Sequence, residues 1–169
     1  MTDRNNIVDF KFTIDRKNKK VIMERIFDAP PELVFRAHTD AELIPKWWTN
    51  TKVAELDVRV GGKWRFVSNW NGQESVSSGE FKEIVPNEKI VETFNIGFAE
   101  TINTTTFEEI SDEEDKTKLT KIVEFSRIED LENLVKYGME QGARTGYERI
   151  AGLLSELIEV NQNDKTNER

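Results

Sequence analysis

His38 is the only histidine in the chain, and there is no cysteine. A nucleophilic triad would need His38 beside a nucleophile and an orienting carboxylate, and no G-x-S-x-G elbow is present. The absence of cysteine excludes disulfides, zinc-thiolate sites and a cysteine nucleophile. No H-E-x-x-H or similar metal-binding spacing occurs. We therefore predict no catalytic residue and no metal site, and interpret His38 as a half-exposed histidine on a short helix.

One glycine pair and one acidic run also lack the pattern of a ligand site. Gly61-Gly62 has no Lys-Ser/Thr partner and no following helix, so it does not predict a phosphate loop. The acidic run at 111–116, SDEEDK, lacks the glycine and the ligand spacing of a calcium loop, and we interpret it as a solvated hairpin tip. We predict no cofactor.

The distinctive side chains are aromatic. Trp47 and Trp48 end a predicted short helix, while Trp64, Phe66 and Trp70 alternate on one face of a predicted strand. Neighbouring strands add Phe81 and Phe94. These rings either fill the core or line a small-molecule pocket, which is typically apolar with a few polar groups. Candidates for those polar groups are Arg25, Arg65, Glu92 and Tyr147.

Three glycines spaced by four, Gly138, Gly142 and Gly146, lie in the helix predicted over 128–160. Each costs about 1 kcal/mol relative to alanine. They share an arc with large apolar residues, so they predict either close backbone packing or an unfilled space beside the helix. A membrane G-x-x-x-G dimer is disfavoured because Glu140, Gln141 and Arg144 separate the glycines. The apolar arc comprises Leu131, Val135, Met139, Ile150, Leu153, Leu157 and Val160.

The elements around these residues follow from periodicity and turn signals. A strand over 21–28 must stop at Pro30-Pro31, and short helices are predicted at 31–38 and 40–48. About six strands follow, with turns at Gly61-Gly62, Asn71-Gly72 and Pro86-Asn87, before the long helix. Strands in series indicate an antiparallel sheet. The prediction is an α+β fold, a curved antiparallel sheet wrapped around a long C-terminal helix.

Composition limits the class of protein. The 169 residues are 37% hydrophobic and 33% charged, which predicts one folded domain over 19–160. Residues 1–18 are predicted to be an arm or edge strand, and 161–169 a flexible tail. The net charge of -8 argues against nucleic acid and anionic membranes as main partners. No signal peptide and no membrane span are expected, so we expect a cytoplasmic location.

Four stretches together resemble the activator of heat shock protein 90 ATPase homologue family, within the START-like, birch-pollen-allergen-like superfamily. They are RIFDAPPELVFRAHTDAELIPKWW, DVRVGGKWRF, GEFKEIVPNEKIVETF and GMEQGARTGYERIAGLLSEL, and they cover nearly all of 20–158. The resemblance implies a helix-grip fold, in which a seven-stranded sheet grips the C-terminal helix across a cavity. It also implies small apolar or amphipathic ligands. The eukaryotic co-chaperones that name the family carry a separate N-terminal domain for which this chain has no room.

The predicted function is non-enzymatic binding of a small hydrophobic or amphipathic ligand, lipid-like or aromatic, between sheet and helix. One alternative is a partner-binding module related to activation of the chaperone ATPase. Another is a cyclase- or hydrolase-like enzyme that uses the cavity. The predicted ligand-binding residues are Trp47, Trp48, Trp64, Phe66, Trp70, Phe81, Phe94, Met139, Gly142 and Gly146.

Overall fold

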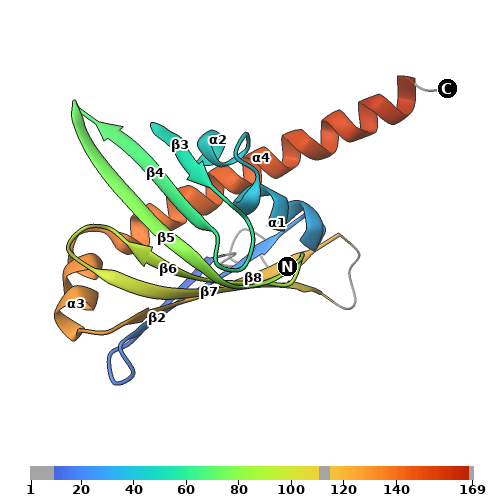
Figure 1. The fold of residues 1–169 in the computed structure, drawn as a ribbon. Helices are drawn as coiled ribbons and strands as arrows, with labels where there is room; N and C mark the ends of the chain where they lie inside the picture. Colours follow the sequence, from blue (N-terminus) through green and yellow to red (C-terminus); the bar gives the residue numbers. More distant parts are fainter. Residues whose placement is uncertain (1–9, 111–114, 168–169) are drawn as a thin grey trace.

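A computed structural model describes residues 10–110 and 115–167. Within these residues, eight antiparallel strands form one curved sheet in the order β1-β2-β8-β7-β6-β5-β4-β3, and four helices accompany it (Figure 1). The predicted α+β helix-grip class is confirmed. The sheet has eight strands rather than the implied seven, because β1 pairs with β2 as an additional edge strand. The strands are β1 (Phe10–Asp15), β2 (Lys20–Phe27), β3 (Thr51–Leu56), β4 (Lys63–Trp70), β5 (Gln73–Val85), β6 (Lys89–Asn95), β7 (Glu100–Glu109) and β8 (Thr117–Phe125).

The turns predicted from glycine and asparagine join these strands. Asn71 and Gly72 both have positive φ, as the two-residue turn between β4 and β5 requires. Gly62 precedes β4 where a Cβ atom would collide with the carbonyl oxygen of Asp57. The predicted acidic hairpin tip lies mostly at 111–114, outside the described residues.

Two short helices follow β2 and lie beside the C-terminal helix. Helix α1 (Pro31–Thr39) begins at Pro31, which suits the first helical turn. Helix α2 (Ile44–Trp47) is shorter than the predicted 40–48. The Asp40 carboxylate accepts the backbone N–H of Glu42 at 2.9 Å, which holds residues 41–43 in turns before α2 begins.

The predicted continuous helix over 128–160 is wrong at one place. It is divided into α3 (Ile128–Lys136) and α4 (Met139–Asn167). Gly138 has φ +94°, a left-handed conformation that ends α3, and its N–H donates to the Val135 carbonyl oxygen at 3.3 Å. Gly138 is therefore a helix-terminating residue, and of the three glycines spaced by four, Gly142 and Gly146 lie within α4.

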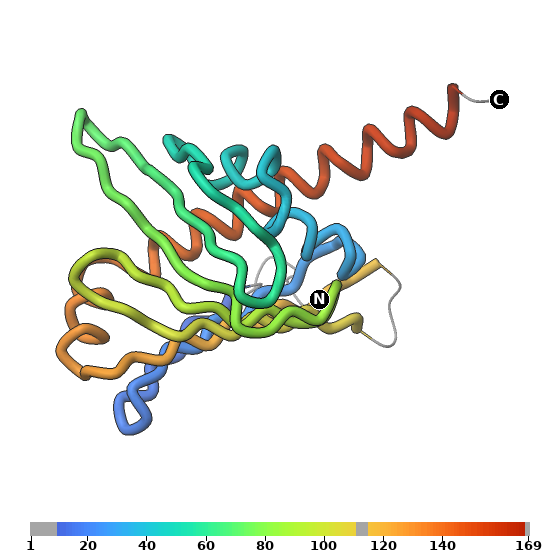
Figure 2. Tube along the Cα trace, viewed as in Figure 1, coloured from blue at the N-terminus to red at the C-terminus, as the bar shows by residue number. Residues whose placement is uncertain are grey.

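Helix α4 runs diagonally past the concave side of the sheet, and its last turns extend beyond the other elements (Figure 2). Its buried residues are Tyr147, Ile150, Leu153 and Leu154. Val160, predicted on the apolar face, is 55% exposed. Residues 161–167, predicted as a flexible tail, continue the helix with exposed side chains.

No helix in the described part of the chain is long and apolar enough to cross a membrane.

Candidate functional site

An open cavity of about 800 Å³ lies between the concave face of the sheet and α4, with α1 and α2 at one side. Strands β2 to β8 supply its floor and one wall, and α4 supplies the opposite wall. All ten residues predicted to bind a ligand line this cavity. They are Trp47, Trp48, Trp64, Phe66, Trp70, Phe81, Phe94, Met139, Gly142 and Gly146.

Four rings form a continuous aromatic wall. The Trp64 ring centre lies 4.9 Å from those of both Phe66 and Phe94. Trp48 stacks on Phe94 with centres 6.2 Å apart and meets Phe66 edge-on at 5.3 Å. Trp64 and Phe66 belong to the buried core as well as the cavity wall, so the two alternatives for the aromatic residues are not exclusive.

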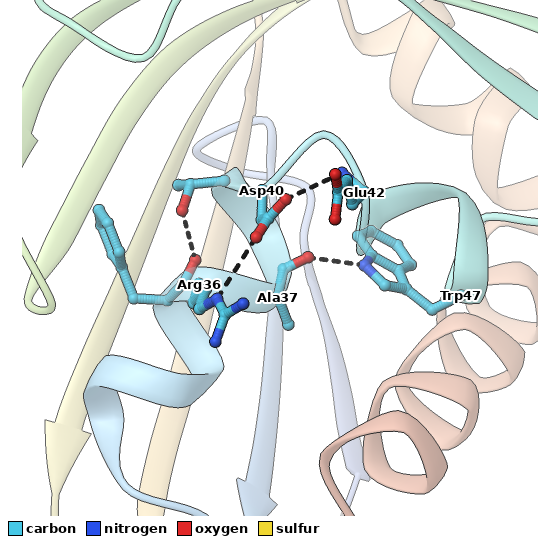
Figure 3. A network of polar contacts seen from close by, with 7 residues as sticks. Arg36, Ala37, Asp40, Glu42 and Trp47 are labelled. Atoms are coloured by element: carbon cyan, nitrogen blue, oxygen red, sulfur yellow. Dashed lines mark hydrogen bonds and ion pairs between the residues drawn. The ribbon is translucent and has the colours of Figure 1, made fainter. Parts of the chain in front are cut away.

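Trp47 is fixed by a hydrogen bond between the short helices. Its indole N–H donates to the carbonyl oxygen of Ala37 at 2.8 Å (Figure 3). The Arg36 guanidinium and the backbone N–H of Glu42 both donate to the Asp40 carboxylate. These two bonds hold the turn between α1 and α2. The α1–α2 connection therefore positions the Trp47 ring at the cavity. Trp70, which is 52% exposed, completes the set of four tryptophans at the outer end of β4.

The α4 wall is bare at its glycines. A Cβ atom at Gly142 or Gly146 would meet no atom within 4 Å. The glycines therefore leave unfilled space, and the close-packing alternative does not hold for α4. Met139, one turn before Gly142, lines the same wall.

Of the four predicted polar groups, two line the cavity and two do not. Glu92 and Tyr147 line the cavity. Arg65 is exposed on the opposite face of β4 from Trp64, as the alternation of a strand requires. Arg25 faces inward from β2 but does not line the cavity, and its guanidinium lies 5.5 Å from the Phe27 ring centre.

Sequence reasoning missed several polar residues of the cavity, among them His38, Thr105 and Lys121. His38 is half-buried, as predicted, and packs between the rings of Trp47 and Phe107, with centres 5.6 and 5.5 Å away. Lys121 stands between the buried Leu119 and Val123 in β8. The alternation of inward and outward side chains along β8 could have identified Lys121, because it places position 121 on the inner face.

Burial shifts the pKa of several ionisable side chains in the cavity. It raises the pKa of Glu92 to about 7, and the Lys121 ammonium opposes the rise. It lowers the pKa of Lys121, with Glu92 opposing, and it raises the pKa of Tyr147. The open cavity leaves part of the Glu92 and Lys121 surface accessible, but protein encloses both groups closely enough to disfavour their charged forms.

His38 is held as a neutral imidazole. Burial lowers the pKa of His38 to about 4, although its hydrogen bond to Val34 opposes the shift. Nδ1 donates to the Val34 carbonyl oxygen at 2.7 Å, which leaves Nε2 as an acceptor. Within the described residues no group of three or more histidine and acidic side chains is placed to hold a metal ion.

A curved sheet that grips a long helix across an open cavity defines the helix-grip, START-like class, a ligand-binding type of domain. The family model described as "Activator of Hsp90 ATPase homolog 1-like protein" matches residues 28–155, and the chain belongs to this family. Among curated proteins no significant match was found.

Solved structures from several bacteria share the fold. Protein Ms6760 from Mycobacterium smegmatis has TM-score 0.77 at 18% identity, covering 87% of this chain and 98% of that one. A protein from Arthrobacter aurescens has TM-score 0.78 at 22% identity, covering 86% and 91%. Protein CV1439 from Chromobacterium violaceum has TM-score 0.67 at 27% identity, covering 79% and 96%.

Proposed function

We propose that the protein binds a small hydrophobic or amphipathic molecule between the sheet and α4. The observation that carries this proposal is the cavity of about 800 Å³, which has aromatic rings on one wall and bare glycines on the other. This volume lies within the range of about 300–1,000 Å³ found for small-molecule pockets. A closed core would have favoured the partner-binding alternative, and an open cavity favours a ligand.

The two walls suit a flat or extended apolar ligand. The stacked and edge-on rings of Trp48, Phe66 and Phe94 offer broad apolar faces. Gly142 and Gly146 allow a ligand to approach the α4 backbone where larger side chains would exclude it. Burial of apolar ligand surface contributes about 25 cal/mol per Å², so a ligand that fills part of this space gains several kcal/mol.

Titration with the neutral apolar dye N-phenyl-1-naphthylamine tests the proposal. All four tryptophans line the cavity, so their fluorescence reports occupancy directly. Gly142→Leu should fill the space and weaken dye binding by about tenfold or more, equivalent to 1.4 kcal/mol. Gly152→Leu is the matched control, because Gly152 lies on the same helix, meets no atom within 4 Å and does not line the cavity. Absence of dye binding to the wild type, or equal binding by both variants, would contradict the proposal.

A second candidate function is an enzyme in which Glu92 transfers a proton. The raised pKa of a carboxyl group inside the cavity favours it, because a general acid or base works best with a pKa near the operating pH. Native mass spectrometry of protein purified from its host identifies the bound molecule in each case. A binder carries the same molecule in the wild type and in Glu92→Gln. An enzyme carries product in the wild type and unconverted substrate in the variant.

A further inference from the structure

We infer that Lys121, Thr105 and Glu92 form an inner polar site that binds the carboxylate head of an amphipathic ligand. The apolar body of the ligand then lies between the aromatic wall and the glycines of α4. This inference rests on the proposed function, since it assigns the chemical class of the molecule that occupies the cavity.

The three side chains come from three adjacent strands. Thr105 of β7 stands directly opposite Lys121 of β8, and Glu92 of β6 is paired with Asn103, two residues along β7. Residues opposite each other on one face lie roughly 5 Å apart and diagonal neighbours roughly 7–8 Å. All three line the cavity, and the charges of Glu92 and Lys121 act on each other, so the side chains face one region of the cavity with Thr105 between them.

None of the three side chains is satisfied by the protein. Within the described residues no hydrogen bond involves Glu92, Thr105 or Lys121 through a side-chain atom, and no ion pair within 4 Å joins Glu92 to Lys121. The Lys121 ammonium lies over the Phe94 ring, whose centre is 5.7 Å from Nζ. The polar atoms of the three side chains are open to the cavity rather than sealed in the core, so a ligand in the cavity can supply the missing bonds.

The character of the site selects an acceptor with negative charge. Lys121 supplies N–H donors and a positive charge, and the Thr105 hydroxyl supplies another donor. Glu92 donates when it carries a proton, and burial already favours that form. A carboxylate accepts from all three at once, with charge-assisted bonds to Lys121.

Binding of such a head couples to protonation of Glu92. Two carboxyl groups beside each other share one proton, because both cannot ionise at low cost. The other titratable groups that face the cavity are Lys121 from β8, His38 from α1, and Tyr147 and Arg149 from α4. Helix α2 and strands β3, β4 and β5 contribute only uncharged side chains to the cavity lining. The pKa of Glu92 is about 7, so at a lower pH Glu92 already carries a proton before the ligand enters. Binding then needs no proton uptake.

Arg149 offers a competing position for an anionic head. Its side chain is exposed and donates to the Thr49 hydroxyl at 3.0 Å, near the opening of the cavity. A ligand with its head at Arg149 would point its tail inward. The inner site predicts the reverse orientation, with the head at the sheet.

The test compares dodecanoate with dodecan-1-ol, which has the same chain and no charge. Tryptophan fluorescence of the full chain measures both affinities. Wild type should bind the acid at least about tenfold more tightly than the alcohol. Lys121→Met should reduce acid affinity to that of the alcohol and leave alcohol binding unchanged, which also shows that the cavity is intact. Lys118→Met is the matched control, because Lys118 lies on the outer face of β8 and pairs with Glu24 at 3.4 Å.

Acid affinity should rise roughly tenfold from pH 8 to pH 6, and this dependence should disappear in Glu92→Gln. Equal affinity for acid and alcohol, or a preference that survives Lys121→Met, would overturn the inference. A preference lost in Arg149→Met instead would place the head at the opening and also overturn it. If neither compound binds the wild type, the proposed function fails as well, so the two failures are distinguishable.

Discussion

The indole of Trp64 lies against Gly79, its partner across strands β4 and β5. A Cβ atom on Gly79 would lie 2.6 Å from the indole nitrogen and would also collide with the Thr93 carbonyl oxygen. Trp64 can therefore occupy this place in the cavity wall only because its cross-strand neighbour has no side chain. The indole nitrogen is buried without a hydrogen-bond partner in the described structure, so apolar packing holds this ring.

The first prediction follows from this contact. Gly79→Ala should destabilise the fold by roughly 1–3 kcal/mol, because the carbonyl oxygen of Thr93 belongs to the backbone and cannot move freely. Urea denaturation measures the change. Gly152→Ala is the control and should add up to about 1 kcal/mol through helix propensity. An unchanged midpoint for Gly79→Ala would show that the strands relax around the new methyl group.

The second prediction concerns the tryptophan held between the short helices. Trp47→Phe removes the hydrogen bond to the Ala37 carbonyl oxygen and should cost roughly 1 kcal/mol or slightly more. Trp70→Phe alters a half-exposed ring and should stay within about 0.5 kcal/mol of the wild type. Thermal unfolding of the two variants provides the comparison. Equal effects would mean that the α1–α2 connection does not depend on the Trp47 hydrogen bond.

The aromatic wall was predictable because strands have a strict period of two. Once one ring of β4 is assigned to the concave face, Trp64, Phe66 and Trp70 follow together. The same rule places Arg65 outside, and it was a poor candidate for that reason. Lys121 was missed because a charged residue in a strand is ordinarily solvated, although its register with Leu119 and Val123 indicates the inner face.

The helix break was harder to predict. Gly138 lies in a sequence whose apolar spacing continues across it, and glycine is compatible with both a helix interior and a helix end. Gly138 has its left-handed φ between α3, which contacts β8, and α4. Tertiary packing of this kind overrides local helix propensity. Whether Gly142 and Gly146 mark close packing or unfilled space also depends on tertiary structure, because it is decided by what lies opposite them.

The third prediction addresses the end of α4. Deleting 161–169 should change the melting temperature by less than about 2 °C, because residues 161–167 are helical but exposed and bury no apolar surface. Circular dichroism should show a loss of helix signal without a loss of cooperativity. A larger fall in melting temperature would show that this segment docks on another surface.

The fourth prediction is acid sensitivity caused by His38. Its folded pKa of about 4 lies below the ordinary value of 6.5, so the unfolded chain binds the proton first. The stability from neutral His38 is present above pH 6.5 and is lost as the pH falls toward 4. The stability difference between wild type and His38→Gln should therefore decrease by roughly 2 kcal/mol from pH 7.5 to 4.5. A constant difference would mean that His38 accepts a proton without cost.

The fifth prediction concerns Glu92, for which stability falls as the pH rises, the reverse of the dependence expected for His38. Its folded pKa of about 7 lies above the ordinary value of 4.5, so the folded state holds the proton more tightly. The associated stability is fully present below pH 4.5 and is lost as the pH rises through 7. Glu92→Gln cannot ionise, so it should be more stable than the wild type at pH 8 by roughly 2 kcal/mol, after allowance for water in the open cavity.

This advantage of Glu92→Gln should shrink steadily as the pH falls and vanish near pH 4. Loss of stability from protonation of His38 affects both proteins equally and cancels in the comparison. Denaturant titrations at half-unit pH intervals measure the difference, and Glu83→Gln on neighbouring β5 is the control, because Glu83 is exposed and pairs with Lys89 at 3.3 Å. If Glu92→Gln and the wild type differ by the same amount at every pH, the Glu92 carboxyl group is solvated like a surface residue. The inner polar site would then lose its proton-linked component, and only the contact with Lys121 would remain to select a carboxylate.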